Sequence, residues 1–352
     1  MKRFLVLLTI LNLAGIGYAQ DKASATALIK EGVRLHDEEK YDLAIAKYRE
    51  ALLADAGNLD ALYEMSFTFF SANKNDSCIV YCEKLIEMKA PAEILKNVYV
   101  SFGSCYDNMH MPEKSIEVYD KGIKAFPDFY LLHYNKGITY AGIKKYGEAK
   151  MSFEKSVSLK PFHSGSNYWL SRILADDNKK IPAILTASMV SIIESGDPKS
   201  QRGKSSGELI ESLLKSNVTK NENGGANISL MIPSGDKKKE NDFSAVDLIL
   251  SMMEVSPTLN DSIKLDTEEK KLSFKLQMMC NALNDYRKQK GFYWKFYAPF
   301  FSSLKKEGHV DLLARLILLN KNFETNNIWL SEHDEEVKKF SKWLSEFSWT
   351  TN

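Results

Sequence analysis

The sequence lacks the residue patterns that mark most enzymes and metalloproteins. Its six histidines show no paired metal-ligand spacing, and no serine stands in a Gly-x-Ser-x-Gly motif. Gly203, Lys204 and Ser205 have no upstream glycine at the distance that a phosphate-binding loop requires. We therefore expect no catalytic residue, no metal site and no cofactor. An enzyme with dispersed carboxylates stays an alternative, because such pairs leave no signature in their spacing.

An excess of charge of either sign is also missing. The chain has 47 Lys and Arg against 46 Asp and Glu, and loss of Lys2 and Arg3 with a signal peptide would leave 45 against 46. A balance so close to zero gives no broad electrostatic attraction to nucleic acid or to an anionic membrane surface. Neither is therefore an expected partner.

Long apolar runs are absent after the first residues. Lys2 and Arg3 precede an apolar run at residues 4–16, and Gly17, Tyr18 and Ala19 supply small residues near a cleavage position. This order predicts a secretory signal peptide at residues 1–19, of bacterial type, and a periplasmic or secreted protein. The alternative is an uncleaved anchor, although the run is short for a membrane span. No cysteine follows the run, so we do not expect a lipid anchor.

What the sequence does contain is a pair of short helical patterns from Tyr130 to Pro161. The first carries Leu131, Tyr134, Ile138 and Ala141 at helical spacing, and the second carries Ala149, Phe153 and Val157. Gly137 and Ala149 are small residues that allow two antiparallel helices to cross closely. The pattern predicts a helical hairpin.

The hairpin recurs along the chain. Steps of 34, 37 and 34 residues lead back from Gly137 to Gly103, Ser66 and Gly32, with the three extra residues near Ala90. A degenerate fifth copy lies downstream, at Ser171, Leu174, Ala183 and Ala187. Such a copy is typical of a terminal repeat that faces a different neighbour.

In period and small-residue positions, residues 25–196 resemble the tetratricopeptide repeat (TPR) family, with four repeats and one degenerate repeat. The resemblance implies an all-α fold, a right-handed solenoid of helical hairpins, and a non-catalytic role in holding other proteins. In the family, the first helix of each hairpin lines the concave groove. The matching positions here are Ile29, Val33, Tyr63, Phe67, Phe70, Val100, Leu131, Tyr134, Ile138, Tyr168 and Arg172, with Ser104, Asp107 and Asn108 beside Val100.

The predicted groove is apolar and aromatic. Some family members grip an acidic chain end with several Lys and Arg residues, but only Arg172 occupies such a position here. We therefore do not expect capture of an acidic chain end. The occupant is either a helix or extended segment of a partner protein, or residues 243–352 of this chain.

Residues 197–242 have linker composition, rich in Gly, Ser, Asn and Lys. Within them, a short helix is expected at residues 208–215 and a strand at residues 228–232. Residues 243–352 predict a second helical domain. Its expected helices are residues 243–255, a helix capped by Asp266 and running to about Lys288, residues 309–319, and a last helix capped by Ser331.

Seven aromatic residues lie between Phe292 and Phe301 in this domain. Their spacing is helical, but Pro299 is expected to break or restart the helix. Such a dense run is usually core. The alternative is an exposed platform that binds carbohydrate or another ligand by stacking.

The four cysteines are too few for a disulfide-stapled scaffold. Cys78 and Cys82 lie one turn apart in a predicted second helix, and Cys105 lies in the next helix. A Cys82–Cys105 disulfide is one hypothesis, and small buried residues at helix contacts are the other.

Overall fold

The computed structural model describes residues 23–197, 199–215, 218–220, 226–228, 240–253, 265–286, 289–319, 321 and 323–349. The predicted signal peptide lies outside them. The chain divides into two compact units, Met1–Ala149 and Lys150–Asn352. None of the described helices is long and apolar enough to cross a membrane.

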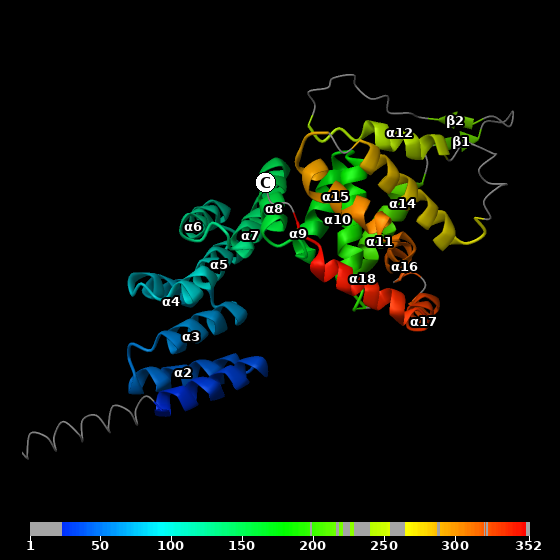
Figure 1. Ribbon diagram of the computed structural model, residues 1–352. Helices are drawn as coiled ribbons and strands as arrows, with labels where there is room; N and C mark the ends of the chain where they lie inside the picture. The colour runs from blue at the N-terminus through cyan, green and yellow to red at the C-terminus, as the bar shows by residue number, and fades with distance from the viewer. Residues whose placement is uncertain are drawn as a thin grey trace, which may run out of the picture. The chain divides into compact units, whose positions relative to one another are not determined.

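The first unit is a series of helical hairpins (Figure 1). Its helices are residues 23–37, α2 (Tyr41–Ala54), α3 (Leu59–Ser71), α4 (Asn75–Glu87), α5 (Ala92–Asn108), α6 (Pro112–Ala125) and α7 (Tyr130–Gly142), and α8 (Tyr146–Leu159) crosses into the second unit. Consecutive helices pack against each other, and α5 also contacts α3 and α7. The first helices of neighbouring hairpins therefore lie side by side.

Each hairpin turn contains one residue in the left-handed backbone region. These residues are Glu39, Asn73, His110, Lys144 and Asn178, with φ between 55° and 60°. In each turn, the N–H of this residue donates to the carbonyl three residues before it. The N–H of the following residue donates to the carbonyl five residues before itself, as Lys40 does to Leu35. The steps of 34, 37, 34 and 34 residues between the turns agree with the repeat period in the sequence.

The small residues lie at the helix crossings. A Cβ atom on Gly32 would come 2.4 Å from Cε1 of Tyr48, and one on Gly103 would come 2.4 Å from Cε1 of Tyr119. No real Cβ atom makes so close a contact, so only glycine fits against these rings. In the second hairpin, the corresponding pair is Ser66 and Cys82, both buried. Gly32 and Gly103 therefore occupy equivalent places.

The second unit is a cluster of helices with one small hairpin of strands (Figure 1). After α8, its elements are α9 (Ser164–Asp176), α10 (Lys180–Ile193), α11 (Gln201–Leu214), β1 (Val218–Lys220), β2 (Ala226–Ile228), α12 (Ser244–Met253), α14 (Glu268–Asp285), α15 (Phe292–Lys306), α16 (Val310–Leu318), α17 (Phe323–Glu332) and α18 (Asp334–Glu346). Every residue from 181 to 192 in α10 is buried. Helices α9, α11, α12, α15 and α16 all contact α10, so this helix is the centre of the unit.

Within the region expected to be a linker, the short helix predicted at residues 208–215 is longer and packed. Helix α11 runs from Gln201 to Leu214, and the Ser200 side chain caps it by accepting from the N–H of Gly203 at 3.0 Å. A Cβ atom on Gly207 would lie 2.5 Å from the carbonyl oxygen of Ile317. Gly203, Ser206 and Gly207, which suggested a linker, are therefore buried residues at helix contacts. Beyond α11, the predicted strand at residues 228–232 is described only as far as Ile228, where β2 pairs antiparallel with β1.

Two helix starts in the second unit differ from the sequence prediction. Thr267, and not Asp266, caps α14, because its hydroxyl accepts from the N–H of Lys270 at 3.2 Å. The sequence predicts that Ser331 caps the last helix, but Ser331 lies in the last turn of α17, and α18 begins after His333.

The prediction that Pro299 interrupts its helix is wrong. Helix α15 continues from Phe292 to Lys306 through Pro299, which is itself exposed. An interior proline costs roughly 3 kcal/mol, whereas each large apolar side chain gains roughly 1.5 to 3 kcal/mol on burial. Six buried aromatic rings on the same helix outweigh the missing hydrogen bond.

Candidate functional site

Nine of the eleven predicted groove residues lie on first helices of hairpins in the first unit. Ile29, Val33, Tyr63, Phe70, Val100, Leu131, Tyr134 and Ile138 are half-buried there, and Phe67 is exposed. Tyr168 and Arg172 lie on α9 of the second unit, where Arg172 is exposed. The first unit thus retains a row of partly open apolar side chains on successive helices.

Helix α3 presents the most distinct open face. Ala61, Leu62, Met65, Ser66, Thr68 and Phe69 are buried on one side. Besides Leu59, which is partly open at the start of the helix, the residues that are open or partly open are Asp60, Tyr63, Glu64, Phe67, Phe70 and Ser71, here called the α3 stripe. Their spacing follows one side of a helix. Two kinds of side chain therefore share this surface, aromatic rings and carboxylates.

Polar bonds between neighbouring first helices fix the stripe in place. His36 Nδ1 and Thr68 Oγ1 are joined by a hydrogen bond of 2.8 Å, and the His36 ring stacks on Phe67 with ring centres 5.1 Å apart. At the equivalent positions 71 residues further on, Thr139 Oγ1 donates to Asp107 Oδ2 at 2.6 Å. These bonds were not recognised in the sequence. Comparison of equivalent positions between repeats would have shown that His36 and Thr68 correspond to Asp107 and Thr139.

The carboxylates of the stripe have no positive partner. Helix α3 contains no Lys, Arg or His, and in the described part of the chain neither Asp60 nor Glu64 makes a hydrogen bond or an ion pair. Burial raises the pKa of the Glu64 carboxyl, and repulsion from Asp60 and Asp37 raises it further. Asp60 and Asp37 are thus both near enough to Glu64 to repel its carboxylate.

The later first helices carry less free charge. Asp107 of α5 accepts from Thr139, and burial raises the pKa of its carboxyl. The basic residues of α5 and α7 are paired, Lys96 with Glu93 and Lys136 with Asp120. Of the acidic residues on α3, α5 and α7, only Asp60 and Glu64 therefore lack a hydrogen bond or an ion pair within the described part of the chain.

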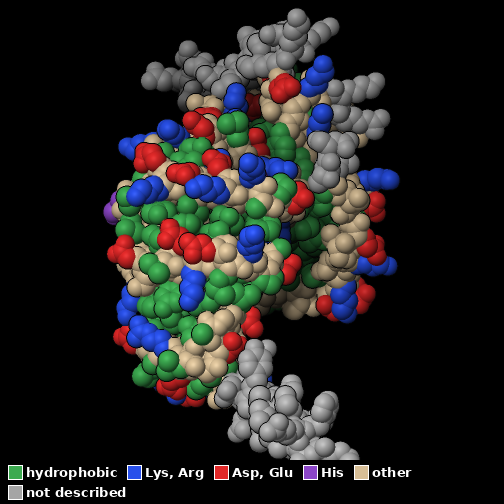
Figure 2. All heavy atoms as spheres, turned by 90° about the vertical axis from the view of Figure 1, so that its left-hand side faces the viewer, with side chains coloured by type: hydrophobic (Ala, Val, Ile, Leu, Met, Phe, Trp, Pro, Cys, Tyr) green, Lys and Arg blue, Asp and Glu red, His purple; other side chains and the backbone are tan. Residues whose placement is uncertain are grey.

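Exposed apolar side chains also occur on second helices of the first unit. Leu43 and Leu53 of α2 and Val80 of α4 are exposed, and Leu53 most of all, at 89%. On the face that Figure 2 shows, hydrophobic side chains form patches among charged side chains of both signs. Apolar exposure alone therefore does not distinguish the predicted groove, whereas the aromatic residues at equivalent repeat positions do.

The aromatic segment of α15 is core and not a stacking platform. Tyr293, Trp294, Phe296, Tyr297, Phe300 and Phe301 are all buried. Tyr297 donates a hydrogen bond of 2.7 Å to Asn167 Oδ1 of α9, and Trp349 stacks on Phe300 with ring centres 4.9 Å apart. Sugar could not reach these rings without opening the core, so this route to carbohydrate binding is excluded.

These contacts also concern the alternative in which residues 243–352 of the chain cover the predicted groove. Helix α15 contacts α10, so downstream residues cover part of the fifth hairpin inside the second unit. Arg172 of the same hairpin stays exposed.

The cysteines are free thiols. Cys78, Cys82, Cys105 and Cys280 are all buried and unbridged. Cys78 Sγ lies 3.8 Å from Cys82 Sγ, and Cys78 also contacts Cys105. The structure therefore contradicts the hypothesis of a Cys82–Cys105 disulfide, and Cys78, Cys82 and Cys105 act as small buried residues at the contact of α4 with α5.

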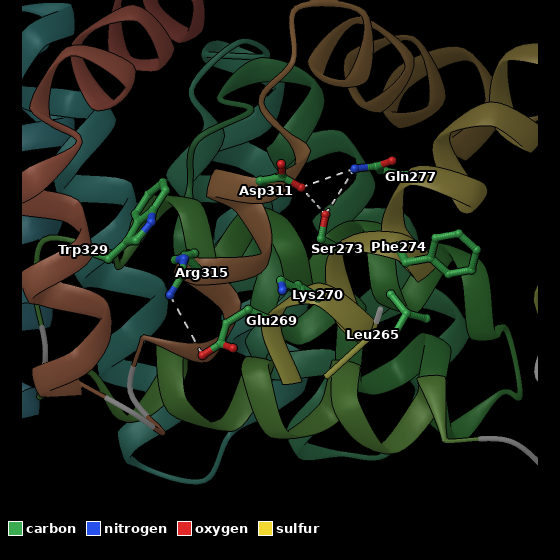
Figure 3. Close-up of a pocket in the computed structure, with 9 residues that line it drawn as sticks. All are labelled: Leu265, Glu269, Lys270, Ser273, Phe274, Gln277, Asp311, Arg315 and Trp329. Atoms are coloured by element: carbon green, nitrogen blue, oxygen red, sulfur yellow. Dashed lines mark hydrogen bonds and ion pairs between the residues drawn. The ribbon is translucent and has the colours of Figure 1, made fainter. Parts of the chain in front are cut away.

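A separate pocket of about 380 Å³ lies in the second unit (Figure 3). Residues from α14, α16 and α17 line it, together with Leu265: Glu269, Lys270, Ser273, Phe274, Gln277, Asp311, Arg315 and Trp329. Ser273 Oγ donates to Asp311, and so does Gln277 Nε2 at 3.3 Å. Its two acidic and two basic residues balance, and none of the lining residues is a histidine or a cysteine.

Arg315 has the best-defined position in this pocket. Its guanidinium lies 4.7 Å from the centre of the Trp329 ring, whose own centre is 3.9 Å from that of His333. Arg315 also donates to Asn326 Oδ1 at 3.4 Å and lies 3.9 Å from Glu269. The arginine links α17 to α16 and α14, so its visible role is to hold these helices together.

Comparison with known proteins identifies the repeat. The family model described as tetratricopeptide repeat matches residues 131–163. Among solved structures, PilF of Pseudomonas aeruginosa aligns with a TM-score of 0.46 and 16% identity, over 55% of this chain and 90% of PilF. PilW, titled a type IV pilus biogenesis factor, aligns with a TM-score of 0.43 and 16% identity, over 54% of this chain and 90% of PilW.

MamA of Desulfovibrio magneticus aligns with a TM-score of 0.42 and 14% identity, over 50% of this chain and 98% of MamA. No curated protein matches this sequence significantly. The chain is a helical repeat protein that contains a tetratricopeptide repeat, in agreement with the sequence prediction of its fold.

Proposed function

We propose that this tetratricopeptide-repeat protein is a non-catalytic scaffold or adaptor that binds a segment of another protein. The segment lies along the first helices of the hairpins, against Tyr63 and Phe67 on α3 and Tyr134 and Ile138 on α7. The carrying observation is that partly open apolar side chains recur on successive first helices, with aromatic rings among them on α3 and α7. Burying one such side chain under a partner gains roughly 1.5 to 3 kcal/mol.

We also propose that the protein works in the cell envelope or outside the cell. This location is supported by the charged, apolar and small segments of residues 1–19, which follow the order of a secretory signal. Fractionation of cells that produce the full chain, with N-terminal sequencing of the product, tests it. Cytoplasmic protein that retains Met1 would contradict it.

Binding is tested by capture of the partner from its own cells. The full chain is crosslinked to its neighbours in the cell envelope, and the protein attached to it is identified. Binding of that protein to the purified full chain is then measured. Replacement of Tyr63, Phe67 and Tyr134 by Ser should abolish this interaction, because it removes the rings that the partner covers.

Leu53→Ser is the matched control, since Leu53 is highly exposed on a second helix and outside the proposed site. It should bind like the original protein. Circular dichroism melts establish that the triple variant is folded. Undiminished binding by a folded triple variant would overturn the proposal, as would equal loss in the Leu53→Ser control.

A further inference from the structure

We propose that the segment bound on the first two hairpins is cationic and amphipathic, with apolar side chains against the α3 stripe and Lys or Arg beside Asp60 and Glu64. This inference rests on the proposed function and narrows its partner to one chemical class. It is carried by the mixture of aromatic rings and carboxylates on a single helix face.

The spacing of the α3 stripe interleaves the two kinds of side chain. Asp60 and Glu64 are one turn apart, as are Tyr63 and Phe67, and the two pairs lie beside each other on the helix. A segment that covers the rings must therefore also cover the carboxylates. It cannot use the apolar surface and leave the charges in water.

Covering these carboxylates is costly unless a positive group accompanies them. A desolvated ionised group without a partner loses far more free energy than one ring gains. The protein itself supplies no full positive charge, because α3 lacks basic residues and neither carboxylate has an ion pair among the described residues; the N-terminus of α3 contributes only a partial charge, beside Asp60. The compensating cation must come from the partner.

The same stripe discriminates against other segments. An acidic segment would meet Asp60, Glu64 and the nearby Asp37, and like charges at such a surface repel. A purely apolar segment would bury carboxylates unpaired. Further along the array, Glu93 is paired with Lys96, Asp107 is half-buried and accepts from Thr139, and α7 has no acidic residue. The basic residues of the partner are therefore expected opposite α3 and its apolar residues opposite α7.

The test measures fluorescence anisotropy with the full chain and three labelled 12-residue peptides. The peptides share the same Leu and Tyr positions and carry Lys, Gln or Glu at the remaining ones. The Lys peptide should bind about tenfold more tightly than the Gln peptide and more tightly still than the Glu peptide. The preference should shrink as salt rises.

Two double variants show which carboxylates cause the preference for the Lys peptide. Asp60→Asn with Glu64→Gln should reduce binding of the Lys peptide to the level of the Gln peptide. Glu117→Gln with Asp120→Asn removes the same charge from α6, where both residues pair with lysines. This control should retain the preference for Lys.

The outcomes separate this inference from the proposed function. Equal affinity for the Lys and Glu peptides, or no binding of any of them, overturns the cationic partner. An equal effect of the α6 control overturns it too, because the attraction would then be non-specific. The proposed function is judged separately, by capture of the partner with the Tyr63, Phe67 and Tyr134 variant.

Discussion

At the scale of residues, single side chains at equivalent positions set how closely the helices of a hairpin approach. Gly32 faces Tyr48 and Gly103 faces Tyr119, while Ser66 faces Cys82 at the same place in the second hairpin. A large ring thus requires glycine opposite, and a small thiol tolerates serine. Each pair is one packing unit and not two independent choices.

This pairing predicts strong coupling between Gly103 and Tyr119. Gly103→Ser alone should lower the free energy of unfolding by about 1 to 3 kcal/mol, because its Cβ would overlap the Tyr119 ring. Adding Tyr119→Cys, which reproduces the pair of the second hairpin, should cost less than the sum of the single changes by about 1 to 3 kcal/mol. Urea unfolding of the three variants measures this difference. Additive effects would contradict the coupling.

His163 predicts a dependence of stability on pH. It caps α9, accepting from the N–H of Ser166 at 3.3 Å, and burial lowers its pKa to about 4, with Arg202 and Lys160 adding repulsion. The unfolded chain takes up a proton near pH 6.5, whereas the folded chain does so only near pH 4. Stability present above pH 6.5 is therefore lost as the pH falls from 6.5 to 4, by about 2 kcal/mol after allowance for solvent screening.

Replacement of His163 by Asn checks this assignment. Asn is a good helix cap and does not titrate in this range. The fall in melting temperature between pH 7 and pH 4.5 should therefore be smaller in His163→Asn than in the original protein. An unchanged pH dependence would show that other groups cause it.

At the scale of elements, the hairpin turns recur more regularly than the helices that they join. All five turns place a non-glycine residue in the left-handed region, although glycine is the usual residue there. Asn73 and Asn178 tolerate this conformation, whereas Glu39, His110 and Lys144 do so at a cost. The turns at Glu39, His110 and Lys144 are thus less stable than they would be with glycine at the left-handed position.

Lys144→Gly should stabilise the protein. The change relieves a left-handed conformation that costs about 1 to 2 kcal/mol, and the greater freedom of glycine in the unfolded chain cancels part of that gain. We expect a net increase of about 0.5 to 1 kcal/mol in the free energy of unfolding, measured by urea denaturation. Asn73→Gly, at the equivalent turn, should change stability by less. A destabilised Lys144→Gly variant would contradict the argument.

At the scale of the whole molecule, the fifth hairpin belongs to the second unit. The sequence predicted a domain boundary after residue 196. Helix α10, however, is buried by α9, which precedes that boundary, and by α11, α12, α15 and α16, which follow it. Gly207 brings α11 against α16, and α15 and α16 contact α10 directly. The degenerate repeat is therefore the core of the downstream helical cluster.

Truncation after residue 196 should therefore expose an apolar helix. The fragment would lose α11, α12, α15 and α16, which cover α10, and an exposed surface of this kind leads to aggregation. We expect the fragment to elute as aggregates in size-exclusion chromatography under conditions where the full chain does not. A monomeric fragment with a cooperative melt would show that the array is complete at residue 196.

The sequence by itself determined the hairpins and their period, because close helix crossings require small residues at fixed spacing. The structure also bears out the expectation that the fifth repeat faces a different neighbour. Only the tertiary structure decided that residues 201–214 of the Gly- and Ser-rich stretch form a packed helix, that Pro299 lies within a helix, and that the carboxylates of α3 have no ion pair among the described residues. These outcomes depend on residues far apart in the chain, whose burial or lack of a partner no local pattern records.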